Sequence, residues 1–135
     1  MIRNLFTASV IVILLVSCNS GPGPGGSATI TGKVYAYDYT VNNNFTVHTV
    51  TDSGYAGNVN VYLIYGDDPS YGDNVKTGPD GTYQFKYLRP GKYKVYAYSF
   101  DYTHATTDVA RIKDVEITKR KQDVAVDTIT VNLKQ

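Results

Sequence analysis

The chain has 135 residues, with 13 lysines and arginines against 12 aspartates and glutamates, for a formal net charge of +1. Its basic residues are scattered, apart from Lys119–Lys121, so we expect no nucleic-acid binding, which requires a basic stripe. A single cysteine excludes an internal disulfide and a cysteine-ligated metal site, so the fold must be stabilised by its apolar core.

Residues 1–17 have the pattern of a secretion signal. Met1–Arg3 is a short basic start, Leu5–Val16 is an almost continuous apolar run, and small residues close it ahead of Cys18. The run is too short for a comfortable membrane-spanning helix, and the glycines and prolines that follow could not continue one. We therefore expect residues 1–17 to be a cleaved signal peptide. Removal of Arg3 with it leaves twelve basic against twelve acidic residues.

The end of this segment, Leu15-Val16-Ser17-Cys18, resembles the lipobox of bacterial lipoproteins. The resemblance implies that Cys18 is thioether-linked to diacylglycerol, becomes the mature N-terminus and is acylated there. Several acyl chains anchor a protein stably, because each buried methylene contributes about 0.8 kcal/mol. Asn19 stands where an aspartate commonly signals inner-membrane retention, so the resemblance implies the outer membrane of the bacterial cell envelope. The alternative is an ordinary signal with an incidental cysteine.

The segment Asn19–Ser27 reads NSGPGPGGS, which has nothing to bury and predicts neither a helix nor a strand. We expect residues 18–28 to be the lipidated cysteine and a flexible tether. Nine such residues reach about 15–20 Å. The tether would hold a domain at residues 29–135 just clear of the lipid headgroups.

From Thr29 onwards, apolar and polar residues alternate with the period of two that is typical of strands. One side of the first strand has Ile30, Gly32, Val34 and Ala36, and the other has Lys33, Tyr35, Tyr37 and Tyr39. Seven strands are expected, at Thr29–Tyr39, Asn58–Tyr65, Val75–Thr77, Thr82–Tyr87, Lys92–Phe100, Val109–Thr118 and Asp123–Leu133. This spacing predicts an all-β sandwich of two antiparallel sheets. The polar segment Thr40–Gly57 is expected to form a long loop or an extra hairpin.

Two turns and several core positions follow from the same pattern. Gly78–Gly81 and Arg89–Gly91 have the proline and glycine residues that tight turns require. Between and after these turns, the inward positions are expected to be Tyr83, Phe85, Leu88, Tyr93 and Val95.

The runs Asn58–Leu63, Thr77–Phe85 and Leu88–Val95 resemble the carboxypeptidase regulatory-like domain family. That family has a prealbumin-like, Ig-like, seven-stranded antiparallel Greek-key sandwich, shared with the B-type repeats of collagen adhesins. The resemblance covers most of Ile30–Phe100 and, more loosely, the last two strands. It implies this fold for the chain and says little about function.

In adhesin repeats of that group, a lysine on the first strand and an asparagine on the last can be joined by an isopeptide bond, helped by a buried acid. Lys33 and Asn132 lie on suitable strands. The acid position corresponds to Tyr87, and a tyrosine cannot serve as the shared proton carrier. We therefore do not expect this bond.

Few residues could support catalysis, because the chain has two histidines, one glutamate and no G-x-S-x-G motif. We therefore do not expect an enzyme or a cofactor. His48 and His104 are expected in surface loops, and nothing in their spacing indicates a shared metal. The group Asp67–Asn74 offers oxygen ligands for calcium but fits no EF-hand. A β-turn prefers the same residues and is the favoured interpretation.

Thirteen tyrosines and no tryptophan are the unusual feature of the composition. The outward tyrosines of the first strand, together with Tyr96 and Tyr98, would form one aromatic face if their strands were neighbours. Such a face would suit stacking on sugars or docking of a partner. The alternative is that tyrosine covers the sheet because of its high strand propensity. The candidate ligand-binding residues are Tyr35, Tyr37, Tyr39, Tyr96 and Tyr98.

These observations predict a membrane-anchored lipoprotein of the bacterial cell envelope with a non-catalytic β-sandwich as a structural or interaction module. The alternative is a surface protein that binds glycan or peptide through its tyrosine-rich sheet face. The expected partners are the membrane, through the lipid anchor, and an envelope protein or a glycan.

Overall fold

The structure is a computed structural model that describes residues 21–42, 44, 48–103 and 107–135. Cys18 and His104 lie outside these residues, as does the expected signal peptide. No helix in the described part of the chain is long and apolar enough to cross a membrane.

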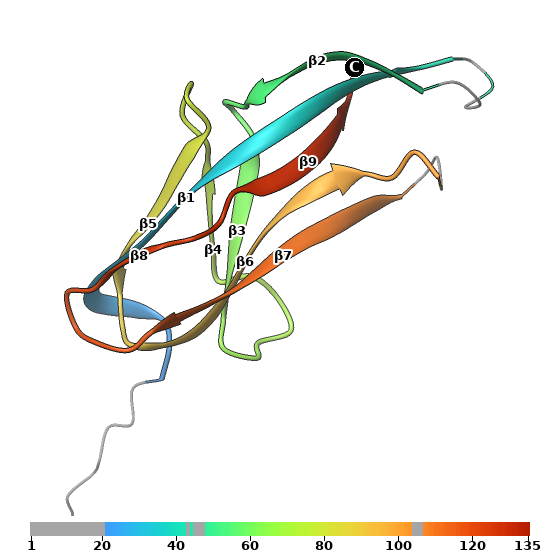
Figure 1. Cartoon of the computed structure of the whole chain (residues 1–135). Helices are drawn as coiled ribbons and strands as arrows, with labels where there is room; N and C mark the ends of the chain where they lie inside the picture. The colour runs from blue at the N-terminus through green and yellow to red at the C-terminus, as the bar shows by residue number, and fades with distance from the viewer. Residues whose placement is uncertain (1–20, 43, 45–47, 104–106) are drawn as a thin grey trace, which may run out of the picture.

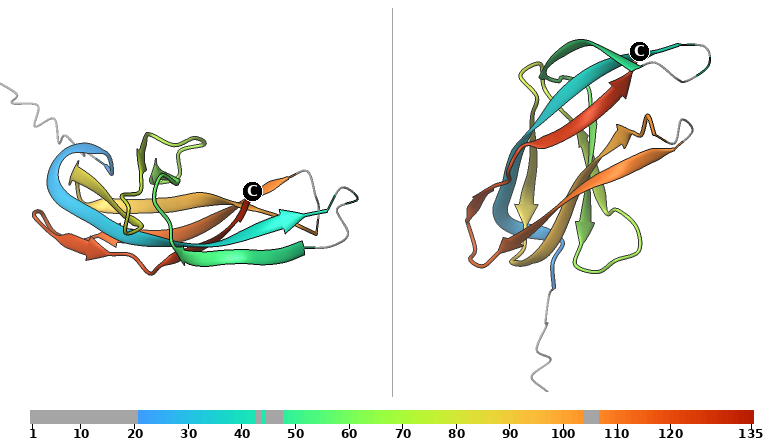
Figure 2. Two further views of the ribbon diagram at one scale, coloured as in Figure 1. Left: turned by 90° about the horizontal axis from the view of Figure 1, so that it is seen from above. Right: turned by 45° about the vertical axis from the view of Figure 1, so that its right-hand side comes forward.

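The described residues form nine strands in two sheets, which confirms the predicted all-β sandwich (Figures 1 and 2). The strands are β1 (Pro24–Val41), β2 (His48–Tyr55), β3 (Asn60–Tyr65), β4 (Asp73–Lys76), β5 (Thr82–Leu88), β6 (Gly91–Phe100), β7 (Asp108–Ile117), β8 (Asp123–Ala125) and β9 (Ile129–Lys134). One sheet has the order β4-β3-β6-β7, and the other contains β2, β1, β5, β8 and β9.

The long strand β1 organises the five-stranded sheet. Its first half pairs with β5 and β8, and its second half pairs with β2 and β9. The β1–β2 pairing confirms the hairpin alternative for Thr40–Gly57. The chain enters β8 at the end of the sandwich where β1 begins, so β8 and β9 run in the same direction as β1 (Figure 1).

Two features of the prediction are therefore wrong. There are nine described strands instead of seven, because β2 is added and the expected strand Asp123–Leu133 divides into β8 and β9. The sheet around β1 is also mixed and not purely antiparallel, since both of these strands pair with β1 in parallel.

The predicted alternation of β1 is confirmed at its inner side, where Ile30 and Val34 are fully buried. Gly32 lies opposite Tyr83 in the β1–β5 register. A Cβ atom at Gly32 would collide with the Tyr83 ring, so the glycine makes room for this large core side chain. The other inward positions predicted for β5 and β6 are buried as well: Phe85, Leu88, Tyr93 and Val95.

The expectation that Asn19–Ser27 forms no strand is wrong for its second half, because β1 begins at Pro24. The Gly23 amide donates to the Tyr93 hydroxyl at 2.9 Å, and that hydroxyl donates to the Arg89 carbonyl at 2.6 Å. The Arg89 side chain donates from Nε to the Gly21 carbonyl at 2.8 Å. A Cβ atom at Gly26 would overlap the Leu88 carbonyl, so this close approach requires glycine. Because this segment consists mainly of glycine and proline, it has no alternation of apolar and polar side chains from which a strand could be predicted.

Candidate functional site

The five tyrosines predicted to share one face lie on two different sheets. Tyr35, Tyr37 and Tyr39 belong to β1, whereas Tyr96 and Tyr98 belong to β6 in the four-stranded sheet. The prediction of a single aromatic face is therefore corrected. Because β1 and β6 are not neighbours in either sheet, these side chains do not lie side by side on one sheet face.

On the four-stranded sheet, Tyr96 and Tyr98 are joined by two tyrosines that the sequence analysis did not select. Tyr62 on β3 is paired directly with Tyr96 on β6. Tyr98 lies two residues further along the same face, and Tyr71 reaches over from the β3–β4 loop. We call Tyr62, Tyr71, Tyr96 and Tyr98 the tyrosine quartet.

Ring contacts hold the quartet together. Tyr62 stacks on Tyr96 with centroids 5.0 Å apart and an interplanar angle of 16°. Its ring also contacts Tyr71 at 4.9 Å and Tyr98 at 5.6 Å. Tyr96 and Tyr98 meet edge to face at 5.5 Å. Aromatic pairs of this kind each contribute roughly 0.5–1.5 kcal/mol beyond their area.

The quartet has a buried centre and an exposed rim. Tyr96 faces outward from the sheet, yet only 8% of its surface is exposed, because the other rings cover it. Burial, followed by the hydrogen bond to Tyr98 and the nearby tyrosines, raises the pKa of Tyr96 to about 12. Tyr71 and Tyr98 are 50% and 46% exposed, and Ile112, opposite Tyr96 on β7, is 53% exposed. The result is an exposed apolar band across β3, β6 and β7.

A groove of about 720 Å³ with both polar and apolar lining lies beside this band. Tyr62 and Tyr98 form part of its wall, together with polar side chains from β3, β7 and β9: Asn60, Asp108, Asn132 and Lys134. Aromatic rings next to amide and carboxylate groups can contact both the apolar face and the hydroxyls of a polar ligand.

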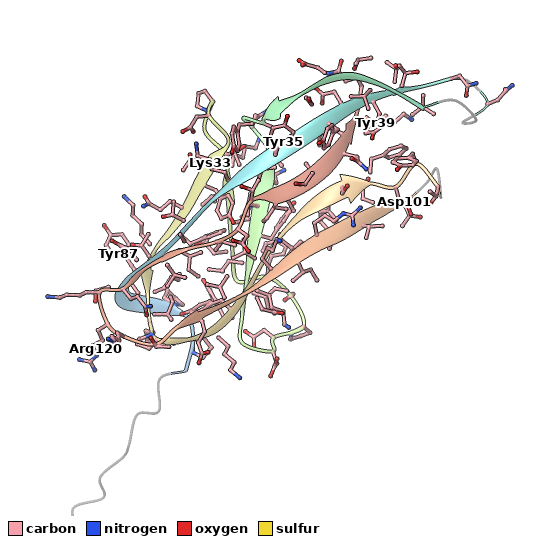
Figure 3. The ribbon with its side chains drawn as sticks, viewed as in Figure 1. Lys33, Tyr35, Tyr39, Tyr87, Asp101 and Arg120 are labelled. Carbon is pink, nitrogen blue, oxygen red and sulfur yellow. The ribbon has the colours of Figure 1, made fainter. Side chains whose placement is uncertain are left out.

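The tyrosines of β1, of which Figure 3 labels Tyr35 and Tyr39, make ring contacts apart from the quartet. Tyr35 contacts Tyr37 at 5.4 Å and Tyr55 at 5.5 Å, both edge to face. Its hydroxyl donates to the Ser53 hydroxyl at 3.3 Å. Further along β1, the Tyr39 ring contacts Tyr102 at 5.4 Å. The first contact lies within β1 and the second joins β1 to β2. Tyr102 belongs to the loop between β6 and β7, so the third contact joins β1 to the other sheet.

Lys33, on β1, and Asn132, on the neighbouring strand β9, lie at different positions along β1. Lys33 Nζ lies 3.9 Å from the Asp80 carboxylate and 4.7 Å from the centre of the Tyr55 ring. Asn132 pairs with Tyr37, four residues further along β1, which corresponds to roughly 13 Å. Tyr87, at the acid position, is 71% exposed and has a φ of 59°. The geometry thus separates the residues that an isopeptide bond would need together.

The segment Asp67–Asn74 covers most of the β3–β4 loop and the start of β4, and backbone hydrogen bonds organise it. The Asp68 amide donates to the Tyr65 carbonyl at 3.1 Å, and the Gly72 amide donates to the Leu63 carbonyl at 2.9 Å. The Asp73 carboxylate accepts from the Asn74 amide at 2.8 Å. Among the described residues, no group of three or more His, Cys, Asp or Glu side chains is placed to hold a metal ion. His48 begins β2.

Taken together, the fold defines an all-β sandwich whose outer face carries a packed tyrosine quartet. No family model matches the chain, and no curated protein matches it. Among solved structures, it is similar to a Pseudomonas aeruginosa protein described as a "putative carbohydrate binding protein". That similarity has a TM-score of 0.43 and 14% sequence identity, and it covers 78% of this chain and 90% of the other.

Proposed function

We propose that this chain is a lipid-anchored protein of the bacterial outer membrane whose β-sandwich is a non-catalytic interaction module, related to the carboxypeptidase regulatory-like domains that its strand-turn runs resemble. The lipobox-like Leu15–Cys18 supports the anchor. The observation that carries the interaction role is the exposed apolar band with Tyr71, Tyr98 and Ile112. Contiguous apolar surface of this kind on a sheet face commonly marks a contact site.

The anchor is tested by replacing Cys18 with Ser. The parent chain is expected in the membrane pellet with an intact mass that includes acyl groups, and the variant is expected to leave the membrane. A variant that stays in the membrane like the parent would show that lipidation at Cys18 is wrong.

A second candidate function is the capture of glycan through the quartet and the adjoining groove. It is favoured by one observation: Tyr62 and Tyr98 line the same groove as Asn60, Asp108 and Asn132. Tyrosine offers a sugar a flat apolar surface, and the amides and carboxylate can hydrogen-bond its hydroxyls.

A glycan array distinguishes this candidate from a protein-docking role. Tyr98→Thr and Asn60→Ala are expected to abolish glycan binding, whereas the matched changes Tyr35→Thr and Ser53→Ala, on the opposite sheet, are expected to preserve it. A pull-down from envelope fractions that depends on Tyr71 and Tyr98 but not on any glycan would favour the protein partner.

A further inference from the structure

The first described residues are bound to one end of the sandwich. Gly21 accepts from the Arg89 guanidinium, and the Gly23 carbonyl accepts from the Arg89 amide at 2.9 Å. Pro24 pairs with Leu88 in the β1–β5 register. The segment expected to be a free tether is therefore part of the folded domain from Gly21 onwards.

This attachment shortens the distance between the domain and an anchor at Cys18. Two residues, Asn19 and Ser20, separate Cys18 from Gly21, so the two Cα atoms are three steps apart and a fully extended chain places them about 10 Å apart at most. A nine-residue coil would have reached about 15–20 Å. The end of the sandwich that binds Gly21 must then lie against the headgroup region.

The same end presents a cluster of cations. The β7–β8 turn carries Lys119, Arg120 and Lys121, all exposed, and Arg120 lines one cavity with Arg89 and Gly25–Ser27. Figure 3 shows Arg120 at the end of the molecule where β1 begins, far from Asp101. Neither this turn nor the Leu88–Gly91 turn contains an acidic residue.

The shape of the β7–β8 turn is held by Gln122. Its side-chain oxygen accepts from the amides of Thr118 at 2.8 Å and Lys119 at 3.1 Å. The backbone carbonyl of Gln122 accepts from the Thr29 amide at 2.9 Å, which ties the turn to β1. The three cations are thus displayed by a bound turn beside the N-terminal segment.

Acidic residues at this end lie on both sides of the N-terminal segment. The β3–β4 loop carries Asp67 and Asp68, and Gly66 of that loop lies next to Pro22. Glu116 and Asp123, on the strands that flank the basic turn, are also exposed. The chain therefore leaves the domain between a basic turn and an acidic loop.

We propose that the cationic β7–β8 turn and Arg89 bind the anionic headgroups of the membrane that holds the anchor. This inference rests on the proposed lipidation of Cys18. The domain would tilt so that the basic turn contacts phosphates and the acidic loop points away. Each Lys or Arg near an anionic leaflet strengthens such binding about fivefold, and salt weakens it.

The test uses the acylated protein, purified from membranes and inserted into vesicles of phosphatidylcholine alone or mixed with phosphatidylglycerol. Hydrogen exchange of the Thr118–Gln122 amides is expected to slow by about tenfold or more in the anionic vesicles and to recover at high salt. Exchange in the β3–β4 loop serves as the internal reference and is expected to stay the same.

Two charge-reversal variants complete the design. K119E/R120E/K121E is expected to lose the protection, and K76E/R111E/K134E, with the same change in charge on other parts of the sandwich, is expected to keep it. Acylated protein with equal exchange in both vesicle types would overturn this inference alone. Protein without acyl mass would overturn the anchor and the inference with it.

Discussion

Tyr62 and Tyr96 face each other across β3 and β6, with ring centroids 5.0 Å apart and planes inclined by 16°. The pair sits on the outer side of the sheet, where side chains usually contact water. Because Tyr71 and Tyr98 cover it, the Tyr96 ring is almost fully buried. The quartet therefore acts as a small second core on the surface of the sheet.

The first prediction concerns the stability that this small core contributes. Tyr96→Ala is expected to lower the free energy of unfolding by about 3 kcal/mol, because it opens a cavity beside the rings of Tyr62 and Tyr98. Tyr98→Thr removes a half-exposed ring and should cost about 1 kcal/mol. Urea unfolding of both variants provides the measurement. Equal effects would show that Tyr96 is not the centre of the quartet.

A second prediction follows from the ionisation of Tyr96. Its pKa is raised from 10.0 to about 12, so the folded protein keeps the neutral phenol where the unfolded chain loses the proton. The stability from this group is complete below pH 10 and is lost as the pH rises towards 12. In Tyr96→Phe, the decline of stability over this range should be shallower, as thermal unfolding at several alkaline pH values can measure. An unchanged slope would contradict the raised pKa of Tyr96.

The third prediction tests the docked N-terminal segment. A Cβ atom at Gly26 would overlap the Leu88 carbonyl, whereas one at Gly54 on β2 would meet nothing within 4 Å. Gly26→Ala is expected to cost about 1–3 kcal/mol, because backbone on both sides must move. Gly54→Ala, the matched control, should be close to neutral or slightly stabilising. Chemical denaturation compares the two, and similar stabilities would indicate that Gly21–Ser27 is a loose tether.

The fourth prediction concerns the turn before β5. The Thr82 amide and hydroxyl donate to the Asp80 carboxylate at 3.1 and 2.9 Å. These hydrogen bonds, with a smaller effect of Lys33, hold the pKa of Asp80 below its usual value of 3.8. A lowered pKa stabilises the fold above pH 3.8, and this stabilisation is lost as the pH falls through the folded-state pKa.

In Asp80→Asn, the free energy of unfolding should therefore fall less steeply as the pH is lowered into the acid range. Asp127→Asn, at an exposed aspartate between β8 and β9, is the control and should leave the profile as it is. Thermal unfolding between neutral pH and about pH 2 measures both. A parent-like slope in the Asp80 variant would count against the role of this carboxylate.

Much of the fold was predictable because its signals are local. Alternation along Thr82–Leu88 and Gly91–Phe100 depends only on each strand, so Tyr83, Phe85, Tyr93 and Val95 were correctly assigned to the core. The Gly78–Gly81 turn was predictable for the same reason, and Gly81 has the positive φ of 77° that such a turn uses. The start of β1 was missed because glycine and proline carry no alternating pattern.

The candidate site was only half predictable. Alternation correctly assigned Tyr98 to the outward side of its strand, but it could not tell which strands are neighbours. Tyr62 joins the site through the β3–β6 register, and Tyr71 joins through the path of a loop. No periodicity encodes either relationship.

By itself, the sequence determined the all-β class, the inward and outward sides of most strands and the tight turns, since each is set by neighbours within a few residues. Only the tertiary structure decided that β1 and β6 belong to different sheets, that β8 and β9 run parallel to β1, and that Gly21–Ser27 is bound to the domain. These features depend on contacts between residues far apart in the chain. Such contacts are set by the packing of the whole core and by the need to pair every buried backbone N–H and C=O group.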